Sequence, residues 1–115
     1  MRELRFIIDG QIIKKDPECD FDNLVPGTAG YLVAVFNFSE EWKNTVKVAA
    51  FYGDKGECPP QILKDGYSCV IPKEALAGKR FKISILGKNK TLKITTNKVE
   101  IIQNGGTVCQ KQKNY

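Results

Sequence analysis

The sequence contains no histidine. Zinc sites are therefore disfavoured, and any acid–base chemistry would fall to carboxylates, lysine, tyrosine or cysteine. The four cysteines (Cys19, Cys58, Cys69 and Cys109) form no Cys-x-x-Cys pair, and without histidine none can be activated as in papain-like enzymes. The glycine spacings of dinucleotide-binding and P-loop motifs are also missing. These absences predict a protein that is not an enzyme and that uses no cofactor or metal.

Long apolar runs are missing as well. No stretch approaches the roughly 20 residues that span a bilayer, and the N-terminus, Met1-Arg-Glu-Leu-Arg, lacks the apolar core and cleavage site of a signal peptide. We therefore expect no membrane span and no export by a signal peptide. The length of 115 residues, with 42% hydrophobic and 27% charged residues, predicts a single globular domain.

The even number of cysteines leaves two interpretations. A disulfide could join Cys58 and Cys69 if they lie on neighbouring strands of a hairpin. We favour the other interpretation, in which the cysteines stay reduced in the cytoplasm and pack as small apolar side chains. A core of this size does not need covalent cross-links.

Short runs of β-branched and aromatic residues alternate with turn residues along the chain, which predicts an all-β domain. The predicted strands are residues 4–8, 11–14, 31–38, 46–52, 61–63, 67–71, 80–86, 91–96 and 98–103. Asp9-Gly10 and Asp65-Gly66 predict hairpin turns between the strands on either side of them.

Helical material is limited to single turns at residues 39–44, where Ser39 is placed to act as the N-cap, and at residues 72–76. Two turns are too little to cover a sheet. The predicted fold is therefore an antiparallel two-sheet β-sandwich, Ig-like or jelly-roll-like, with a small β-barrel as the alternative. Trp42 is expected to plug the open end of the sandwich, with its indole N–H bound to a carbonyl.

The predicted domain covers residues 1–106 and starts with a hairpin at residues 1–15. Residues 107–115 form a polar C-terminal tail.

The net charge of +5 is unevenly distributed. Residues 75–99 hold seven lysines and arginines and no acid. Alternation along the predicted strands places four of these cations on a solvent face: Arg80, Lys82, Lys93 and Lys98. Four acids instead cluster within seven residues of a predicted loop: Asp16, Glu18, Asp20 and Asp22. Calcium is an alternative role for the acids, but the glycine and the distant glutamate of a calcium loop are missing.

Nucleic acid is the first alternative partner for the basic face, because lysine and arginine neutralise phosphates. The face is mostly lysine, however, and the sequence indicates no interleaved aromatic residues that would stack bases. A solvated face that prevents edge-to-edge aggregation, or a surface for an acidic protein partner, is the favoured interpretation.

Several short motifs occur in a fixed order between residues 30 and 106. They are Phe-x-Phe-Ser-x-x-Trp (36–42), Lys-x-Ala-x-Phe (47–51), Cys-x-Ile-Pro-x-Glu-x-Leu (69–76), a strand closing at Gly87, and Thr-Thr-Asn (95–97). This order resembles a β-sandwich module of tail, baseplate and adsorption proteins, including tail-fibre N-terminal modules, in phages and prophages of Gram-positive bacteria. The sequence departs from that module in two ways: it ends at Tyr115 where the module opens a longer chain, and Lys73 stands where a second tryptophan is expected.

The resemblance implies a structural or protein-binding role, with other protein subunits as partners in a homo-oligomer or a virion, and a location in the virion or the cytoplasm of the bacterial host. We expect the cations of the basic face and the four acids to make these contacts. The alternative function is a small inhibitor from a phage or mobile element that binds a host protein or nucleic-acid complex through the basic face.

Overall fold

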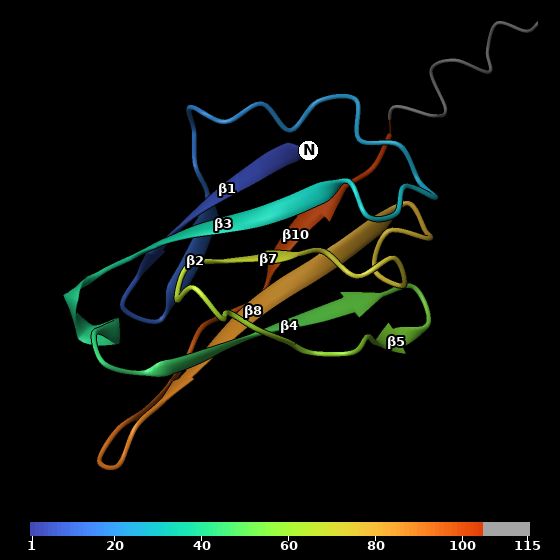
Figure 1. Ribbon diagram of the computed structural model, residues 1–115. Coiled ribbons are helices and arrows are strands. Elements are labelled where there is room, and N and C mark those ends of the chain that lie inside the picture. The colour runs from blue at the N-terminus through green and yellow to red at the C-terminus, as the bar shows by residue number, and fades with distance from the viewer. Residues whose placement is uncertain (105–115) are drawn as a thin grey trace, which may run out of the picture.

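The computed structural model describes residues 1–104, and nearly all of its regular structure is β-strand (Figure 1). In chain order the elements are β1 (Arg2–Asp9), β2 (Ile12–Lys15), β3 (Leu32–Phe38), the 3₁₀ turn η1 (Glu40–Trp42), β4 (Val46–Gly53), β5 (Gly56–Glu57), β6 (Gln61–Ile62), β7 (Ser68–Val70), β8 (Arg80–Lys88), β9 (Lys93–Thr95) and β10 (Val99–Ile102). The predicted tail at residues 107–115 lies outside the described residues.

The strands form two sheets that pack face to face. The four-stranded sheet has the order β2-β1-β3-β7, and the six-stranded sheet has the order β10-β8-β4-β5, with β6 also paired to β4 and β9 also paired to β8. The predicted β-sandwich is therefore confirmed. The sheets do not close into the barrel that was the alternative.

In the described part of the chain, all strand pairs but one are antiparallel. β1 and β3 run parallel, with Arg2 opposite Leu32 and Ile8 opposite Phe38. After the β1–β2 hairpin, residues 16–31 carry the chain across to the other side of β1 before β3 begins, as Figure 1 shows. The sequence did not indicate this pair, because alternation specifies which face a side chain occupies and not the direction of the neighbouring strand.

The hairpin predicted at Asp9-Gly10 is confirmed. β1 and β2 pair antiparallel up to Asp9 and Ile12, and Gly10 has the positive φ of 60° that such a turn requires of its first central residue.

The hairpin predicted at Asp65-Gly66 is wrong. β6 pairs with β4 in one sheet, and β7 pairs with β3 in the other. The turn thus transfers the chain between sheets, and the Asp65 carboxylate holds it by accepting hydrogen bonds from the amides of Tyr67 (2.9 Å) and Ser68 (2.7 Å). The Asp-Gly dipeptide predicts a tight turn whether the flanking strands pair with each other or belong to different sheets. Which strands pair is determined by long-range contacts.

The second helical turn is also different from the prediction. Residues 72–76 form successive turns, in which Ala75 and Leu76 donate to the carbonyls of Pro72 and Lys73 at 3.0 Å, and no helix follows. Ala75 and Leu76 are buried, and the side-chain amide of Gln103 donates to the carbonyls of Leu76 (3.0 Å) and Gly78 (2.8 Å). The segment therefore lies against the chain just after β10.

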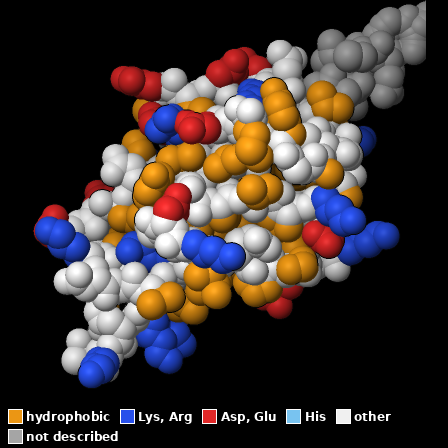
Figure 2. Space-filling view, viewed as in Figure 1, with side chains coloured by type: hydrophobic (Ala, Val, Ile, Leu, Met, Phe, Trp, Pro, Cys, Tyr) orange, Lys and Arg blue, Asp and Glu red, His pale blue; other side chains and the backbone are white. Residues whose placement is uncertain are grey.

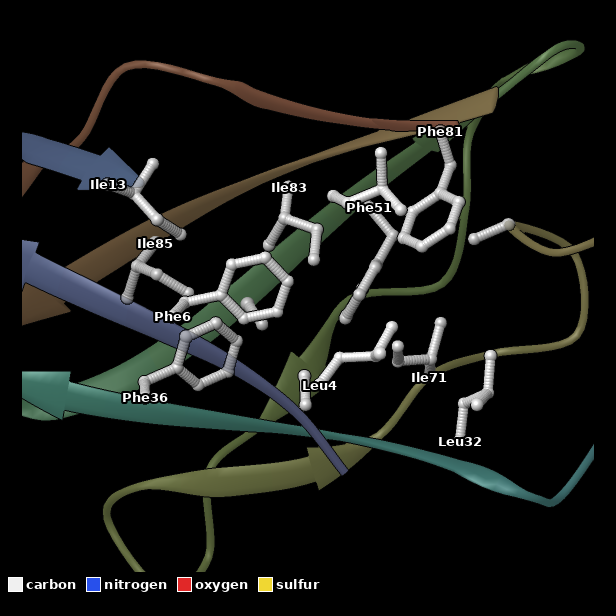
Figure 3. Packing of buried hydrophobic residues seen from close by; sticks show 14 of the residues in the cluster. Leu4, Phe6, Ile13, Leu32, Phe36, Phe51, Ile71, Phe81, Ile83 and Ile85 are labelled. Atoms are coloured by element: carbon white, nitrogen blue, oxygen red, sulfur yellow. The ribbon is translucent and has the colours of Figure 1, made fainter. Parts of the chain in front are cut away.

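The core lies between the inner faces of the two sheets and consists of aliphatic and aromatic side chains (Figure 3). Alternate residues of each long strand point inward, as the period of two predicts. The rings of Phe6 and Phe36 from neighbouring strands stack at a centroid distance of 5.5 Å. The other side chains labelled in Figure 3 are Leu4, Ile13, Leu32, Phe51, Ile71, Phe81, Ile83 and Ile85.

Trp42 closes one end of the sandwich, as predicted. Its side chain is fully buried, and its indole N–H donates to the carbonyl of Gly10 at 2.8 Å. Gly87 lies directly under the ring, because a Cβ there would sit 2.7 Å from two ring carbons. The side chain of Ser39 does not cap η1 and instead accepts a hydrogen bond from the amide of Gly10 at 2.9 Å.

The Thr-Thr-Asn motif joins the two sheets. Thr96 Oγ1 accepts from the amide of Ile85 in the six-stranded sheet at 2.9 Å. Asn97 accepts from the amide of Ile13 (2.8 Å) and donates its own amide to the carbonyl of Gln11 (3.0 Å), both at the β2 edge of the four-stranded sheet. Backbone groups at this edge are thereby satisfied without closing the sheets into a barrel.

The Trp42–Gly87 contact predicts a coupled pair of substitutions. Trp42→Ala should lower the free energy of unfolding by about 3–5 kcal/mol, because it leaves a large cavity and an unpaired Gly10 carbonyl. Gly87→Ala should cost about 1–3 kcal/mol through overlap with the ring. In the Trp42→Ala background the same change should cost almost nothing, and denaturant unfolding of the four proteins measures this coupling. Additive costs would contradict the contact.

Asp65 predicts a specific loss of stability in acid. Partial burial acts to raise the pKa of this carboxyl, but hydrogen bonds from the Ser68 hydroxyl and from the amides of Tyr67 and Ser68 together lower its pKa below the ordinary value of 3.8. A lowered pKa stabilises the fold above the unfolded-state value, and the stabilisation is lost as the pH falls through the folded-state value. The stability advantage of the native protein over Asp65→Asn should therefore shrink from about pH 5 to about pH 2. An advantage that is constant with pH would show that the charge of Asp65 plays no part.

Candidate protein interface

Arg80 and Lys82 lie on the outer face of the six-stranded sheet. They alternate along β8 with Phe81 and Ile83, which are buried, as the sequence predicts. Lys98 precedes β10 and is exposed, and Glu100 faces Lys82 across the β8–β10 pair.

These side chains surround Tyr52 of β4, which faces Lys82 from the other side. The ammonium group of Lys98 lies 4.0 Å from the centre of the Tyr52 ring, and Arg80 forms an ion pair with Glu100 at 3.4 Å. The expectation that no aromatic residue interleaves with the cations is wrong. Tyr52 comes from a strand about 30 residues before Lys82, and only the β4–β8 register brings them together.

Lys93 lies apart from this group. It sits on β9 opposite Lys88, beyond the point where β10 stops pairing with β8. The four predicted cations therefore share one face but form two groups at its ends. One group contains Arg80, Lys82 and Lys98, and the other contains Lys93 together with Lys88 and Lys90 of the hairpin.

An apolar strip that the sequence analysis missed separates the two basic groups. It consists of Val46, Val48, Ile62 and Leu86, which the register places side by side across β6, β4 and β8. Val46 is 66% exposed and Ile62 is 58% exposed. Val46, Val48 and Leu86 line a shallow hollow of about 490 Å³ together with Lys88, Asn89 and Lys90.

Figure 2 shows hydrophobic side chains along β4 and lysines or arginines at the tip of the β8–β9 hairpin. The only sequence signal for the strip is that both alternating sets of β4 are largely apolar. That pattern does not say which set faces solvent.

Lys47, the lysine of the Lys-x-Ala-x-Phe motif, does not belong to the basic face. It is half-buried, its ammonium group donates to the Thr45 carbonyl at 3.1 Å, and it lies 5.2 Å from the centre of the Phe38 ring. Burial lowers the pKa of this lysine. The position therefore serves packing at the Trp42 end of the core.

The four predicted acids lie together in the loop after β2, beside the four-stranded sheet. Asp16 and Asp20 each accept a hydrogen bond from a backbone amide two residues on, at 3.0 and 2.8 Å. The guanidinium of Arg2 donates to the carbonyls of Asp20 (3.0 Å) and Asp22 (2.7 Å). Phe21 packs edge-on against Phe6 at a centroid distance of 5.5 Å, so the loop is attached to the core.

Among residues 1–104, no three Asp, Glu, Cys or His side chains come together in a way that could hold a metal ion. In the same range, no helix is long and apolar enough to span a bilayer.

The described cysteines are free thiols, so the alternative disulfide between Cys58 and Cys69 is not formed. Cys69 is on β7 of the four-stranded sheet, and Cys58 follows β5 of the other sheet. Burial and the nearby Asp65 carboxylate raise the pKa of Cys69 to about 12, and burial also raises the pKa of Cys58. Both thiols therefore stay protonated and unreactive near neutral pH. Cys109 lies outside the described residues.

Comparison with known proteins identifies no relative. No protein-family model matches the chain, and neither the curated proteins nor the solved structures contain a match.

Reversing the charge of Lys82, Lys93 and Lys98 to glutamate, one at a time, should change stability little. Lys82 and Lys93 are exposed, so we expect effects within about 0.5 kcal/mol on the free energy of unfolding. Lys98→Glu should lower the free energy of unfolding by about 0.5–1 kcal/mol, because the contact of the lysine with the Tyr52 ring is lost. Denaturant unfolding measures these changes. A loss above about 3 kcal/mol at any of the three would mean that the side chain supports the fold and is not available to a partner.

Proposed function

We propose that this chain is a non-enzymatic protein-binding module of a phage or prophage, acting in a tail, baseplate or adsorption assembly. The observation that carries the proposal is the separation of charge. Four acids lie in one loop beside the four-stranded sheet, and six cations lie on the outer face of the six-stranded sheet around an exposed apolar strip. Complementary surfaces of this kind orient subunits and speed their association.

The motif residues on which the resemblance rests contribute to the core. Several of them, among them Phe36, Trp42, Phe51 and Leu76, are buried, and Gly87 is the position that makes room for Trp42. The motifs thus specify a scaffold. A rigid scaffold leaves its loops and outer faces to carry recognition, as assembly modules require.

The second candidate is an inhibitor that binds a host protein or nucleic-acid complex. Tyr52 favours it, because an aromatic ring among Arg80, Lys82 and Lys98 is the arrangement that single-stranded nucleic acids use for stacking and charge neutralisation.

Native mass measurement of the purified protein separates the two candidates. For an assembly module we expect a homo-oligomer that persists in about 0.5 M salt, where exposed charges are screened within a few Å and apolar contacts remain. For an inhibitor we expect a monomer that carries nucleic acid or a host protein at low salt. A monomer without any partner in both conditions would contradict both proposals.

A further inference from the structure

The outer face of the six-stranded sheet has the composition of a binding surface. The four residues of the apolar strip lie at its centre, and the two basic groups lie at its ends. Lys82 and Lys88 are six residues apart on β8, which separates the two ends by roughly 20 Å. A surface of this length fits a segment of several residues.

Most of the cations on this face have no acidic partner within the molecule. Among residues 1–104, Arg80 alone of the six forms an ion pair, with Glu100. Besides Glu100, two acids lie near this face among residues 1–104: Glu57, opposite Tyr52, and Asp54, which lines the same hollow as Arg80, Lys82 and Lys98. The face therefore keeps an excess of positive charge that a second, acidic surface would neutralise.

The chain carries such a surface itself. The acidic loop, residues 16–22, contains four acids and no lysine or arginine. The carboxylates of Glu18 and Asp22 make no hydrogen bond or ion pair within residues 1–104. Arg2 and the Phe21–Phe6 contact hold the loop in one position, which reduces the entropy lost on binding. Val25, 44% exposed, adds an apolar side chain just after the loop.

The loop does not pair with the basic face of its own molecule. It follows the edge of β1 beyond the end of β2, where the Cys19 sulfur accepts a hydrogen bond from the amide of Arg5 at 3.3 Å and Phe21 packs against the inward-facing Phe6. Among residues 1–104, none of its acids forms an ion pair with a cation of the basic face. Complementary surfaces that do not pair within one chain are free to pair between copies.

We propose that the acidic loop of one copy docks onto the outer face of the six-stranded sheet of the next copy. The proposal rests on the assembly function proposed above and names the partner as a second copy of this chain. The apolar strip supplies affinity, and the two basic groups set the orientation of the loop. The contact is head-to-tail, so repetition gives a ring if the rotation closes and a fibre if it does not.

Two charge-reversed variants test the contact. The loop variant carries Glu18→Lys and Asp22→Lys, which spares the carboxylates that fix the loop backbone. The face variant carries Lys82→Glu and Lys93→Glu, one change in each basic group. A control variant with Lys43→Glu and Lys73→Glu has the same change of net charge as the face variant, at exposed positions outside both surfaces.

By sedimentation velocity at low salt, we expect the native protein and the control to associate and each of the two variants alone to be monomeric. Mixing the two variants in equal amounts should restore association, because the unchanged acidic loop of the face variant meets the unchanged basic face of the loop variant. Restoration also shows that both variants are folded. Ile62→Ser in the native protein should weaken association about tenfold or more, because it removes apolar contact area. This variant tests the apolar strip without changing any charge.

The proposal is overturned if either variant associates as well as the native protein, or if the mixture stays monomeric while both variants show native circular dichroism. In the first case assembly uses another surface and the proposed function stands. If the native protein itself does not associate, the proposed assembly function fails first, and with it the docking contact.

Discussion

The contact of the Trp42 indole with Gly10 and Gly87 is the interaction on which the sandwich depends. The N–H binds the carbonyl of the β1–β2 turn, and the ring covers the glycine of β8, so a single side chain links one sheet to the other at their open end. Thr96 and Asn97 link the two sheets at the β2 edge. Thr96 accepts a hydrogen bond from the amide of Ile85 in the six-stranded sheet, and Asn97 is hydrogen-bonded to the backbone of Ile13 and Gln11 at the four-stranded sheet. With these two links the inner faces meet over an apolar core, without a disulfide among residues 1–104.

Because the core lies between the two sheets, the side chains on their outer faces are not needed to stabilise the fold. The cations at both ends of the six-stranded sheet and the apolar strip between them contribute little to the core, and three of the four acids of the loop after β2 are exposed. The half-buried thiols of Cys58 and Cys69 have raised pKa values and stay protonated near neutral pH. The proposed phage role rests on motifs that contribute to the scaffold, and the proposed docking contact rests on the distribution of charge.

The candidate site shows where inference from sequence stops. Alternation correctly placed Arg80 and Lys82 on an outer face, because Phe81 and Ile83 had to be buried. The same rule could not find the strip at Val46 and Ile62, because both sides of β4 are apolar enough to be buried. Tyr52 was missed for a related reason: its neighbours Lys82 and Lys98 come from segments distant in sequence.

The sequence by itself determined the all-β class, the positions of most strands, the burial of Trp42 at the end of the sandwich, and the separation of the acidic loop from the basic strands. These features depend on local periodicity, turn residues and composition. Tertiary structure alone decided the parallel pairing of β1 with β3, the transfer of the chain between sheets at Asp65-Gly66 and the division of the cations into two groups. These features depend on which strands lie side by side. The pairing of strands is set by the simultaneous burial of the apolar faces of all strands, so it cannot be predicted from a local sequence pattern.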